Sequence, residues 1–226
     1  MRFRTRWIAG SAILALLMVA WPIAPAGAVI TCATPLADRA SHWTATLDAS
    51  DAFGCHDGTL VNGAAFGLGS VGTAFSFDGT NDYVAVPDHP LWTLGSADFS
   101  ISFSFNLASS CNPCFFVGAS QGGGSQNKWI VYLWNGNLTF HVNFNGSATG
   151  IEVVSGAFAP LTGIWHHVEL VRAGDVFLLT ADGAPVGASV NTVTIPDPNG
   201  PLTIGQAENL GYIHGFIDEV DIVKGV

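Results

Sequence analysis

Two adjacent histidines are the first residues whose type suggests chemistry. His166 and His167 follow each other in the chain, and imidazole is both a common metal ligand and a common general base. The segment around them is rich in residues that favour strands, and neighbouring side chains on a strand point to opposite faces. The two rings therefore cannot chelate one ion, and we expect them to be half-buried, hydrogen-bonded structural histidines.

A Cys-Asn-Pro-Cys motif is the second candidate. Cys111 and Cys114 have the spacing of redox motifs and of half zinc sites. Redox catalysis of the thioredoxin type needs the motif at the start of a helix in an α/β pattern. A zinc site needs a second pair of matching spacing, whereas Cys32 and Cys55 are 23 positions apart. Neither chemistry is favoured.

Tryptophans beside amides are the third candidate. Trp129 and Trp134 are five positions apart in one apolar run, so on a strand they lie on opposite faces and cannot both be deep core. An indole can stack on the apolar face of a pyranose while amides bond its hydroxyls. We predict Trp134 and Asn143 as ligand-binding residues. The alternative for any one tryptophan is the sandwich core.

Strands must position these residues. Apolar and polar residues alternate strictly from Phe99 to Leu107, which predicts a strand with one buried face. Residues 128–134 and 138–144 flank an Asn-Gly-Asn turn, and residues 164–171 and 176–180 form another expected hairpin. Candidate strands recur every 8 to 14 residues without long helical periodicity. This spacing predicts an all-β fold, a two-sheet antiparallel β-sandwich (jelly roll).

Several of these segments together resemble a known family. The stretch GIWHHVELVRAGDVFLLTADGAPVG from Gly163 to Gly187 is similar to the WHHV and Asp-Gly turn signature of laminin G-like, concanavalin A-like jelly rolls. Residues 58–88, 202–206 and 215–222 resemble further blocks of that family in the same order. The resemblance implies the same sandwich fold. It implies function much less, because the fold carries many functions.

A calcium ion is the cofactor that the resemblance implies. Proteins of this fold often hold calcium where the amino-terminal loop meets the last strand, and the matching positions here are Asp51 and Asp218. Calcium accepts six to eight oxygens at loose geometry. We therefore expect a structural calcium site at Asp51 and Asp218. The alternative is that each aspartate caps a turn, and His56 stands where the family usually has Asn.

Glycoside hydrolysis is a further activity found in this family. Laminarinase-type relatives carry alternating carboxylates on one strand face, and Glu219 with Asp221 resembles the start of that pattern. The position for the next carboxylate is Val223. A retaining glycosidase needs a carboxylate pair, so we expect no catalytic residues and no enzyme.

The first 28 residues resemble an export signal. Arg2, Arg4 and Arg6 precede an apolar run from Trp7 to Trp21, and Ala26-Gly27-Ala28 is a small-residue cleavage pattern. Pro22 interrupts the run before it reaches the length of a spanning helix. We expect residues 1–28 to be removed, residues 29–226 to form one laminin G-like domain, and the protein to be secreted, periplasmic or on the cell surface, without membrane insertion.

The net charge limits which partners residues 29–226 can bind. Four fixed cations against 17 carboxylates give this part a formal net charge of −13, which argues against nucleic acid and anionic lipid as partners.

Four cysteines in an exported chain are expected to form disulfides. Three pairings are possible, and we favour Cys32 with Cys55 and Cys111 with Cys114.

These observations favour an exported binding or adhesion module without catalysis. Its expected partner is an extracellular glycan or glycoprotein, bound through Trp134 and Asn143. Two alternatives stay open at this point: a polysaccharide-degrading enzyme of the same fold, and a protein-recognition or structural domain.

Overall fold

The computed structural model describes residues 39–52 and 56–225. Its strands form two antiparallel sheets, so the predicted two-sheet sandwich is confirmed. Sheet A has the order β13-β12-β11-β6-β15-β4-β3, with β1 paired to β15. Its strands are β1 Arg39–Trp43, β3 Ala65–Leu68, β4 Thr73–Asp78, β6 Phe99–Leu107, β11 His166–Ala173, β12 Val176–Ala181, β13 Ala184–Val190 and β15 His214–Lys224.

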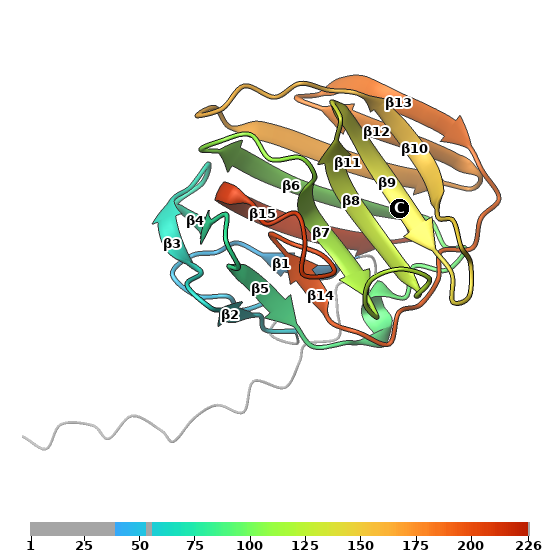
Figure 1. Ribbon diagram of the computed structural model, residues 1–226, viewed down its shortest axis with the longest axis horizontal. Coiled ribbons are helices and arrows are strands. Elements are labelled where there is room, and N and C mark those ends of the chain that lie inside the picture. The colour runs from blue at the N-terminus through green and yellow to red at the C-terminus, as the bar shows by residue number, and fades with distance from the viewer. Residues whose placement is uncertain (1–38, 53–55, 226) are drawn as a thin grey trace, which may run out of the picture. The chain divides into compact units, whose positions relative to one another are not determined.

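Sheet B has the order β10-β9-β8-β7-β14-β5-β2. Its strands are β2 Thr59–Val61, β5 Tyr83–Val86, β7 Cys114–Ser120, β8 Lys128–Trp134, β9 Asn137–Asn143, β10 Ile151–Ala157 and β14 Leu202–Ile204. Figure 1 shows β8, β9 and β10 in front of β6, β11 and β12 of sheet A. A short 3-10 helix, η1 Pro90–Trp92, follows β5. In the described part of the chain, no helix has the length and apolar character needed to span a bilayer.

The core lies between the sheets and is rich in phenylalanine. Phe99, Phe103 and Phe105 of β6 are fully buried, as their alternation predicts. The ring of Phe105 lies 4.5 Å from that of Phe116 on β7, and Phe99 lies 6.0 Å from Phe140 on β9, so rings from opposite sheets pack together. This packing fixes which face of each sheet B strand points inward.

The serines of β6 are less exposed than their alternation suggests. Ser104 is 9% exposed, and its hydroxyl lies 3.3 Å from Nδ1 of His167 on the neighbouring strand β11. Because β6 is flanked by β11 and β15 on its two sides, neighbouring side chains cover its outer face. Simple alternation, which would leave this serine facing water, therefore fails at Ser104.

Short turns connect the hairpins as predicted. Asn135 and Gly136 have φ angles of 50° and 73° between β8 and β9, and Asp182 and Gly183 have 53° and 75° between β12 and β13. Positive φ at both turn residues is the geometry that matches the twist of a two-residue hairpin. The turn is one residue shorter than the predicted Asn-Gly-Asn, because Asn137 already pairs with Trp134.

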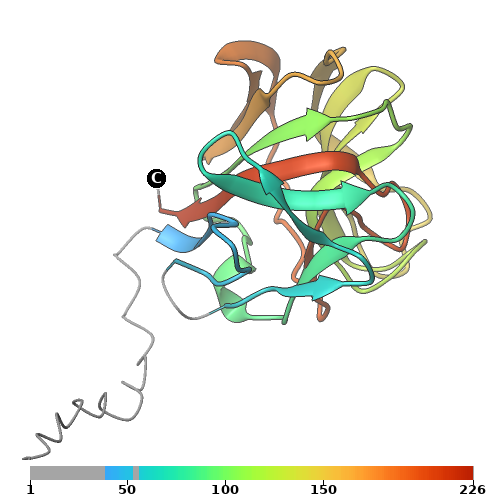
Figure 2. The same ribbon diagram turned by 90° about the vertical axis from the view of Figure 1, so that its left-hand side faces the viewer.

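The last strand contains an irregularity. The register of β15 against β6 shifts between Asp218 and Asp221, and Glu219 has a φ of 51°. One extra residue on β15 is a β-bulge, which interrupts the two-residue alternation. Figure 2 shows the end of β15 (red) beside β1 (blue), which pairs with it.

The two sheets contact each other directly at β10 and β13. A Cβ atom added to Gly156 of β10 would lie 1.7 Å from the carbonyl oxygen of Val186 on β13, which is too close for any side chain. The Ser189 hydroxyl of β13 also donates a hydrogen bond to the Val153 carbonyl of β10. This edge of the sandwich is closed by backbone contact.

Gly156→Ala should therefore lower the free energy of unfolding by about 1–3 kcal/mol, because the added methyl group forces the two edges apart. Gly123→Ala is the matched control, since a Cβ there has no atom within 4 Å. Urea unfolding measures both. Equal stability of the two variants would contradict the close approach.

Candidate functional site

Strand β8 divides its side chains between the core and the outer face of sheet B. Trp129, Val131 and Leu133 belong to the main core. Lys128, Ile130, Tyr132 and Trp134 alternate with them and face the other way. Trp129 is 0% exposed and Trp134 is 50% exposed. The prediction that these two tryptophans lie on opposite faces is confirmed.

Three hollows on this outer face share lining residues, and together they are called the groove. Hollow 1 has a volume of about 230 Å³ and includes Tyr83, Ser120, Gln206 and Glu208. Hollow 2 has about 160 Å³ and includes Lys128, Tyr132, Trp134, His141 and Glu208. Hollow 3 has about 320 Å³ and includes Tyr132, Trp134, Asn137, Thr139, Glu152 and Ser155. Glu208 joins the first two hollows, and Trp134 with Tyr132 joins the last two.

Trp134 has an aromatic support. The Tyr132 ring lies 6.4 Å from it in an edge-to-face arrangement, and Phe115 of β7 packs in turn on Tyr132 at 5.5 Å. Burial, together with the nearby Glu152 carboxylate, raises the pKa of Tyr132 to about 12. The phenol therefore keeps its proton at neutral pH and can donate a hydrogen bond in the groove.

The end of the groove beside Trp134 is held by the small disulfide loop. Cys111 and Cys114 are bonded, as predicted. Asn112 inside this loop donates from Nδ2 to Oδ1 of Asn135 at 2.9 Å and accepts from the Asn135 backbone N–H at 2.9 Å. The loop thus fixes the β8–β9 turn that follows Trp134. Cys32 and Cys55 lie outside the described residues, and their pairing stays a prediction.

The structure does not bring Asn143 to Trp134. In the β8–β9 hairpin Trp134 pairs with Asn137, whereas Asn143 pairs with Lys128 at the far end. Six residue steps along the strand separate these two pairs, a distance of about 20 Å. Asn143 is only 6% exposed, and its amide donates to the Gly124 carbonyl at 3.0 Å and accepts from the Phe144 N–H at 2.8 Å. Asn143 holds the 122–127 loop, and Asn137 is the amide beside Trp134.

The adjacent histidines have structural contacts. His166 Nδ1 lies 2.8 Å from Oδ2 of Asp182 in the turn after β12, and its ring packs against Phe105 and Phe158. The His167 backbone N–H donates to Oδ1 of the same carboxylate at 2.9 Å. One aspartate thus fixes the start of β11 through both residues.

Asp51 and Asp218 are each held by protein donors. Asp51 accepts from the His42 N–H at 3.0 Å, and its other oxygen lies 2.9 Å from Nδ1 of His56. Asp218 accepts from the N–H groups of Val71 and Glu219, at 3.0 and 2.9 Å, and burial raises its pKa. Among residues 39–52 and 56–225, no group of three His, Cys, Asp or Glu side chains is arranged to hold a metal ion.

This donor set does not make a calcium site as it stands. Backbone N–H groups and the His56 ring occupy the oxygens that calcium would need. Calcium at Asp51 and Asp218 stays a prediction, and binding would have to replace these hydrogen bonds.

The carboxylates of β15 lie on sheet A, away from the groove. Glu219 Oε2 is 2.8 Å from Nε2 of His42 on β1. The bulge at Glu219 means that Glu219 and Asp221 do not follow the simple alternation assumed for a carboxylate series. Sequence reasoning missed most of the groove, including Lys128, Tyr132, Glu152 and Glu208. Of these four, only Lys128 and Tyr132 carry a signal, since they alternate in register with Trp134.

Comparison with known proteins agrees with this architecture. The family model described as the concanavalin A-like lectin/glucanases superfamily matches residues 78–226. The chain belongs to this superfamily. The match begins at the end of β4 and includes every strand that lines hollows 2 and 3. No curated protein sequence matches the chain.

Solved structures similar to this superfamily member share its fold at low identity. Domain 4 of AbnA, an extracellular arabinanase from Geobacillus stearothermophilus in complex with arabinotriose, has a TM-score of 0.66 and 18% identity over 83% of this chain and 92% of that one. The ligand-binding domain of botulinum neurotoxin serotype D, in complex with N-acetylneuraminic acid, has a TM-score of 0.61 and 15% identity. That match covers 82% of this chain and 47% of the binding-domain chain.

A third similar structure is a sialidase from Trypanosoma rangeli with a bound difluorosialic acid. Its TM-score is 0.58 at 18% identity, over 81% of this chain and 30% of the sialidase. The chain thus spans less than half of the neurotoxin binding-domain chain and of the sialidase chain. These likenesses show the fold alone.

We predict opposite effects on stability when the two tryptophans of β8 are replaced by alanine. Trp129→Ala should cost about 3–5 kcal/mol of stability, because it leaves a cavity in the core. Trp134→Ala should change the free energy of unfolding by less than about 1 kcal/mol, since half of the side chain already faces water. Denaturant unfolding of both variants tests the assignment of faces. A collapse of stability in Trp134→Ala would place that ring in the core.

Calcium is tested by thermal unfolding. If Asp51 and Asp218 bind calcium in the folded state, millimolar calcium should raise the melting temperature relative to chelator. Asp218→Asn should abolish that increase, and Glu169→Asn on β11 should not. An identical melting temperature with and without calcium would reject the site.

Proposed function

We propose that this protein is an exported carbohydrate-binding or adhesion module, and that the groove on sheet B binds a glycan without cleaving it. The observation that carries the proposal is Trp134, whose half-exposed indole lies where hollows 2 and 3 meet. An exposed aromatic ring beside hydrogen-bonding side chains is the surface that a sugar ring fits.

The polar side chains around Trp134 support this reading. Asn135, Asn137, Thr139 and Ser155 line hollow 3 beside the indole. The Thr139 and Ser155 hydroxyls lie 2.7 Å apart on neighbouring strands, and Ser155 is the exposed member of the pair. Amides and hydroxyls both donate and accept, as the hydroxyl groups of a sugar require. The complex of the AbnA domain with arabinotriose is a precedent for glycan binding on this fold.

The carboxylates of the groove support binding without catalysis. Glu208 pairs with Lys128, whereas Glu152 interacts with Tyr132 in hollow 3. A retaining glycosidase needs two carboxylates about 5–5.5 Å apart across the scissile bond. The two acidic residues of the groove line different hollows and have different partners, which favours binding over catalysis. The enzyme stays the alternative function, because the superfamily includes glucanases.

Export rests on the signal pattern of residues 1–28, which lie outside the described residues. The Cys111–Cys114 disulfide fits an oxidising compartment. The acidic balance of the remaining chain disfavours nucleic acid as a partner. An extracellular glycan or glycoprotein is the partner that agrees with these features and with the groove.

A glycan array with wild-type protein tests the function, in the presence and absence of calcium. Wild type should bind at least one oligosaccharide. Trp134→Ala should weaken that binding at least tenfold, about 1.4 kcal/mol, because the stacking surface is lost. Trp134→Phe should recover part of the affinity. Glu169→Gln, a change on the opposite sheet, should have no effect.

A reducing-end assay on the same glycans tests catalysis. No release of reducing ends is expected from wild type. Hydrolysis that disappears in Glu152→Gln or Glu219→Gln would establish the enzyme instead. Binding only to proteins that carry no glycan would establish the protein-recognition alternative.

A further inference from the structure

The groove contains one ion pair at its middle. Among the described residues that line the three hollows, Lys128 is the one lysine or arginine. Its ammonium group donates to Oε1 of Glu208. The side chains of Lys128 and Glu208 are only 5% and 12% exposed. The cation of the groove is thus already neutralised by a carboxylate of the same chain.

Glu208 is placed there by a tight turn between β14 and β15. Ala207 and Leu210 exchange backbone hydrogen bonds of 3.3 and 2.8 Å, and Glu208 and Asn209 between them have φ angles of 58° and 60°. Two consecutive positive φ angles define a two-residue turn that costs energy for residues other than glycine. The turn is therefore fixed by its surroundings, and it presents Glu208 to Lys128.

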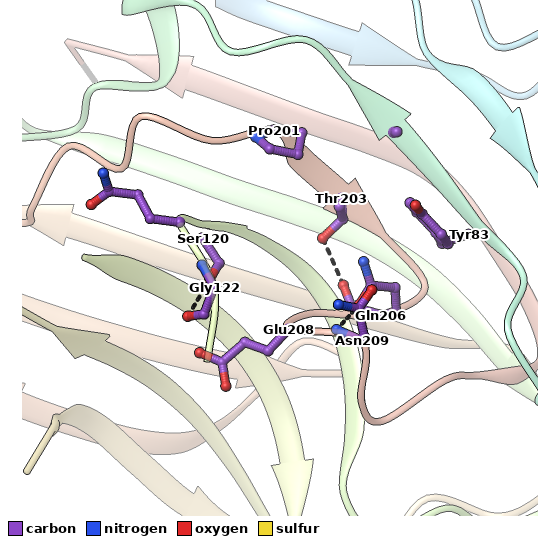
Figure 3. Close-up of a pocket in the computed structure, with 10 residues that line it drawn as sticks. Tyr83, Ser120, Gly122, Pro201, Thr203, Gln206, Glu208 and Asn209 are labelled. Atoms are coloured by element: carbon purple, nitrogen blue, oxygen red, sulfur yellow. Dashed lines mark hydrogen bonds between the residues drawn. The ribbon is translucent and has the colours of Figure 1, made fainter. Parts of the chain in front are cut away.

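Further contacts hold this turn on the sheet. Gln206 Oε1 accepts from the Asn209 N–H at 2.8 Å, and the Thr203 hydroxyl donates to the Gln206 carbonyl at 2.7 Å. Figure 3 shows the turn between Ser120 and Gly122 on one side of hollow 1 and Tyr83 on the other. Thr203 belongs to β14, so the position of Glu208 is tied to the sheet itself.

The remaining titratable groups of the groove leave it with no net positive charge. Glu152 adds a second carboxylate in hollow 3. Burial and the nearby Lys128 lower the pKa of His141, so its ring is neutral at pH 7. Tyr132 keeps its proton. The charged side chains that line the groove are therefore one cation, Lys128, and two carboxylates, Glu152 and Glu208.

We propose that Glu208 is a specificity-determining residue: by occupying Lys128 it reserves the groove for neutral glycans and excludes acidic ones. This inference rests on the proposed glycan-binding function. A uronic or sialic acid would bring a carboxylate next to Glu152 and Glu208, and it would have to displace Glu208 to reach Lys128. Like charges at short distance in a partly desolvated groove are strongly unfavourable.

Removing the Glu208 charge should reverse this preference. In Glu208→Gln the isosteric amide no longer neutralises Lys128, so the carboxylate of an acidic sugar could pair with the ammonium group. Burial already lowers the pKa of Lys128, so an anionic ligand would also stabilise its charged form. A neutral glycan offers no such partner.

The test uses pairs of immobilised oligosaccharides that differ by one carboxylate, N-acetyllactosamine with its sialylated form and cello-oligosaccharides with their glucuronic acid counterparts. Wild type should bind the neutral member of a pair at least tenfold more tightly. In Glu208→Gln the ratio of acidic to neutral binding should rise at least tenfold. The double variant Lys128→Met, Glu208→Gln should lose that gain, because its cation is absent.

Two controls separate the possible failures. Glu169→Gln on β11 removes one charge far from the groove, and it should leave the ratio unchanged. If it raises the ratio as much as Glu208→Gln does, net charge and not Glu208 sets the preference. Wild type that binds acidic members as well as neutral ones overturns the inference while the proposed function stands. Wild type that binds no glycan overturns the proposed function.

Discussion

The strict alternation of side chains along β8 is the constraint on which the groove depends. Trp129, Val131 and Leu133 fill the space against sheet A, and this packing fixes the register of the strand. A slip by one residue would move Trp134 into the core and Trp129 onto the surface. The core therefore decides which residues line the groove.

The outer face of sheet B is built from chain segments that are far apart in the sequence. β8 and β9 supply Trp134 and Asn137, β10 supplies Glu152, and the turn after β14 supplies Glu208. The strands fix lateral spacing, since neighbouring strands lie about 4.8 Å apart. The Cys111–Cys114 loop and the Glu208 turn then fix the two ends of hollow 2. A surface of this kind is preorganised, so its own side chains would lose little conformational entropy when a ligand binds.

The sequence predicted the parts of this structure that follow from local pattern. The alternation from Phe99 to Leu107 identified the buried face of β6, and Asn135-Gly136 identified a hairpin turn. The spacing of Trp129 and Trp134 identified opposite faces. These features depend only on neighbouring residues and on the two-residue period of a strand.

Other parts could not be predicted, because they depend on register and on long-range contacts. Asn143 and Trp134 are nine positions apart in the chain, yet hairpin pairing puts them at opposite ends of their strands. The bulge at Glu219 gives no periodic signal. Glu208 is 80 residues from Lys128, and only the fold brings the two together.

The most direct test of the account is an NMR titration of the tryptophan indole N–H signals with a neutral oligosaccharide identified on the array. The groove model predicts that the Trp134 signal shifts with saturation, while the signals of Trp43, Trp92 and Trp129, which are buried in the core, stay in place. Saturable binding that leaves the Trp134 signal unmoved, or that moves only the signal of Trp165 just before β11, would contradict it.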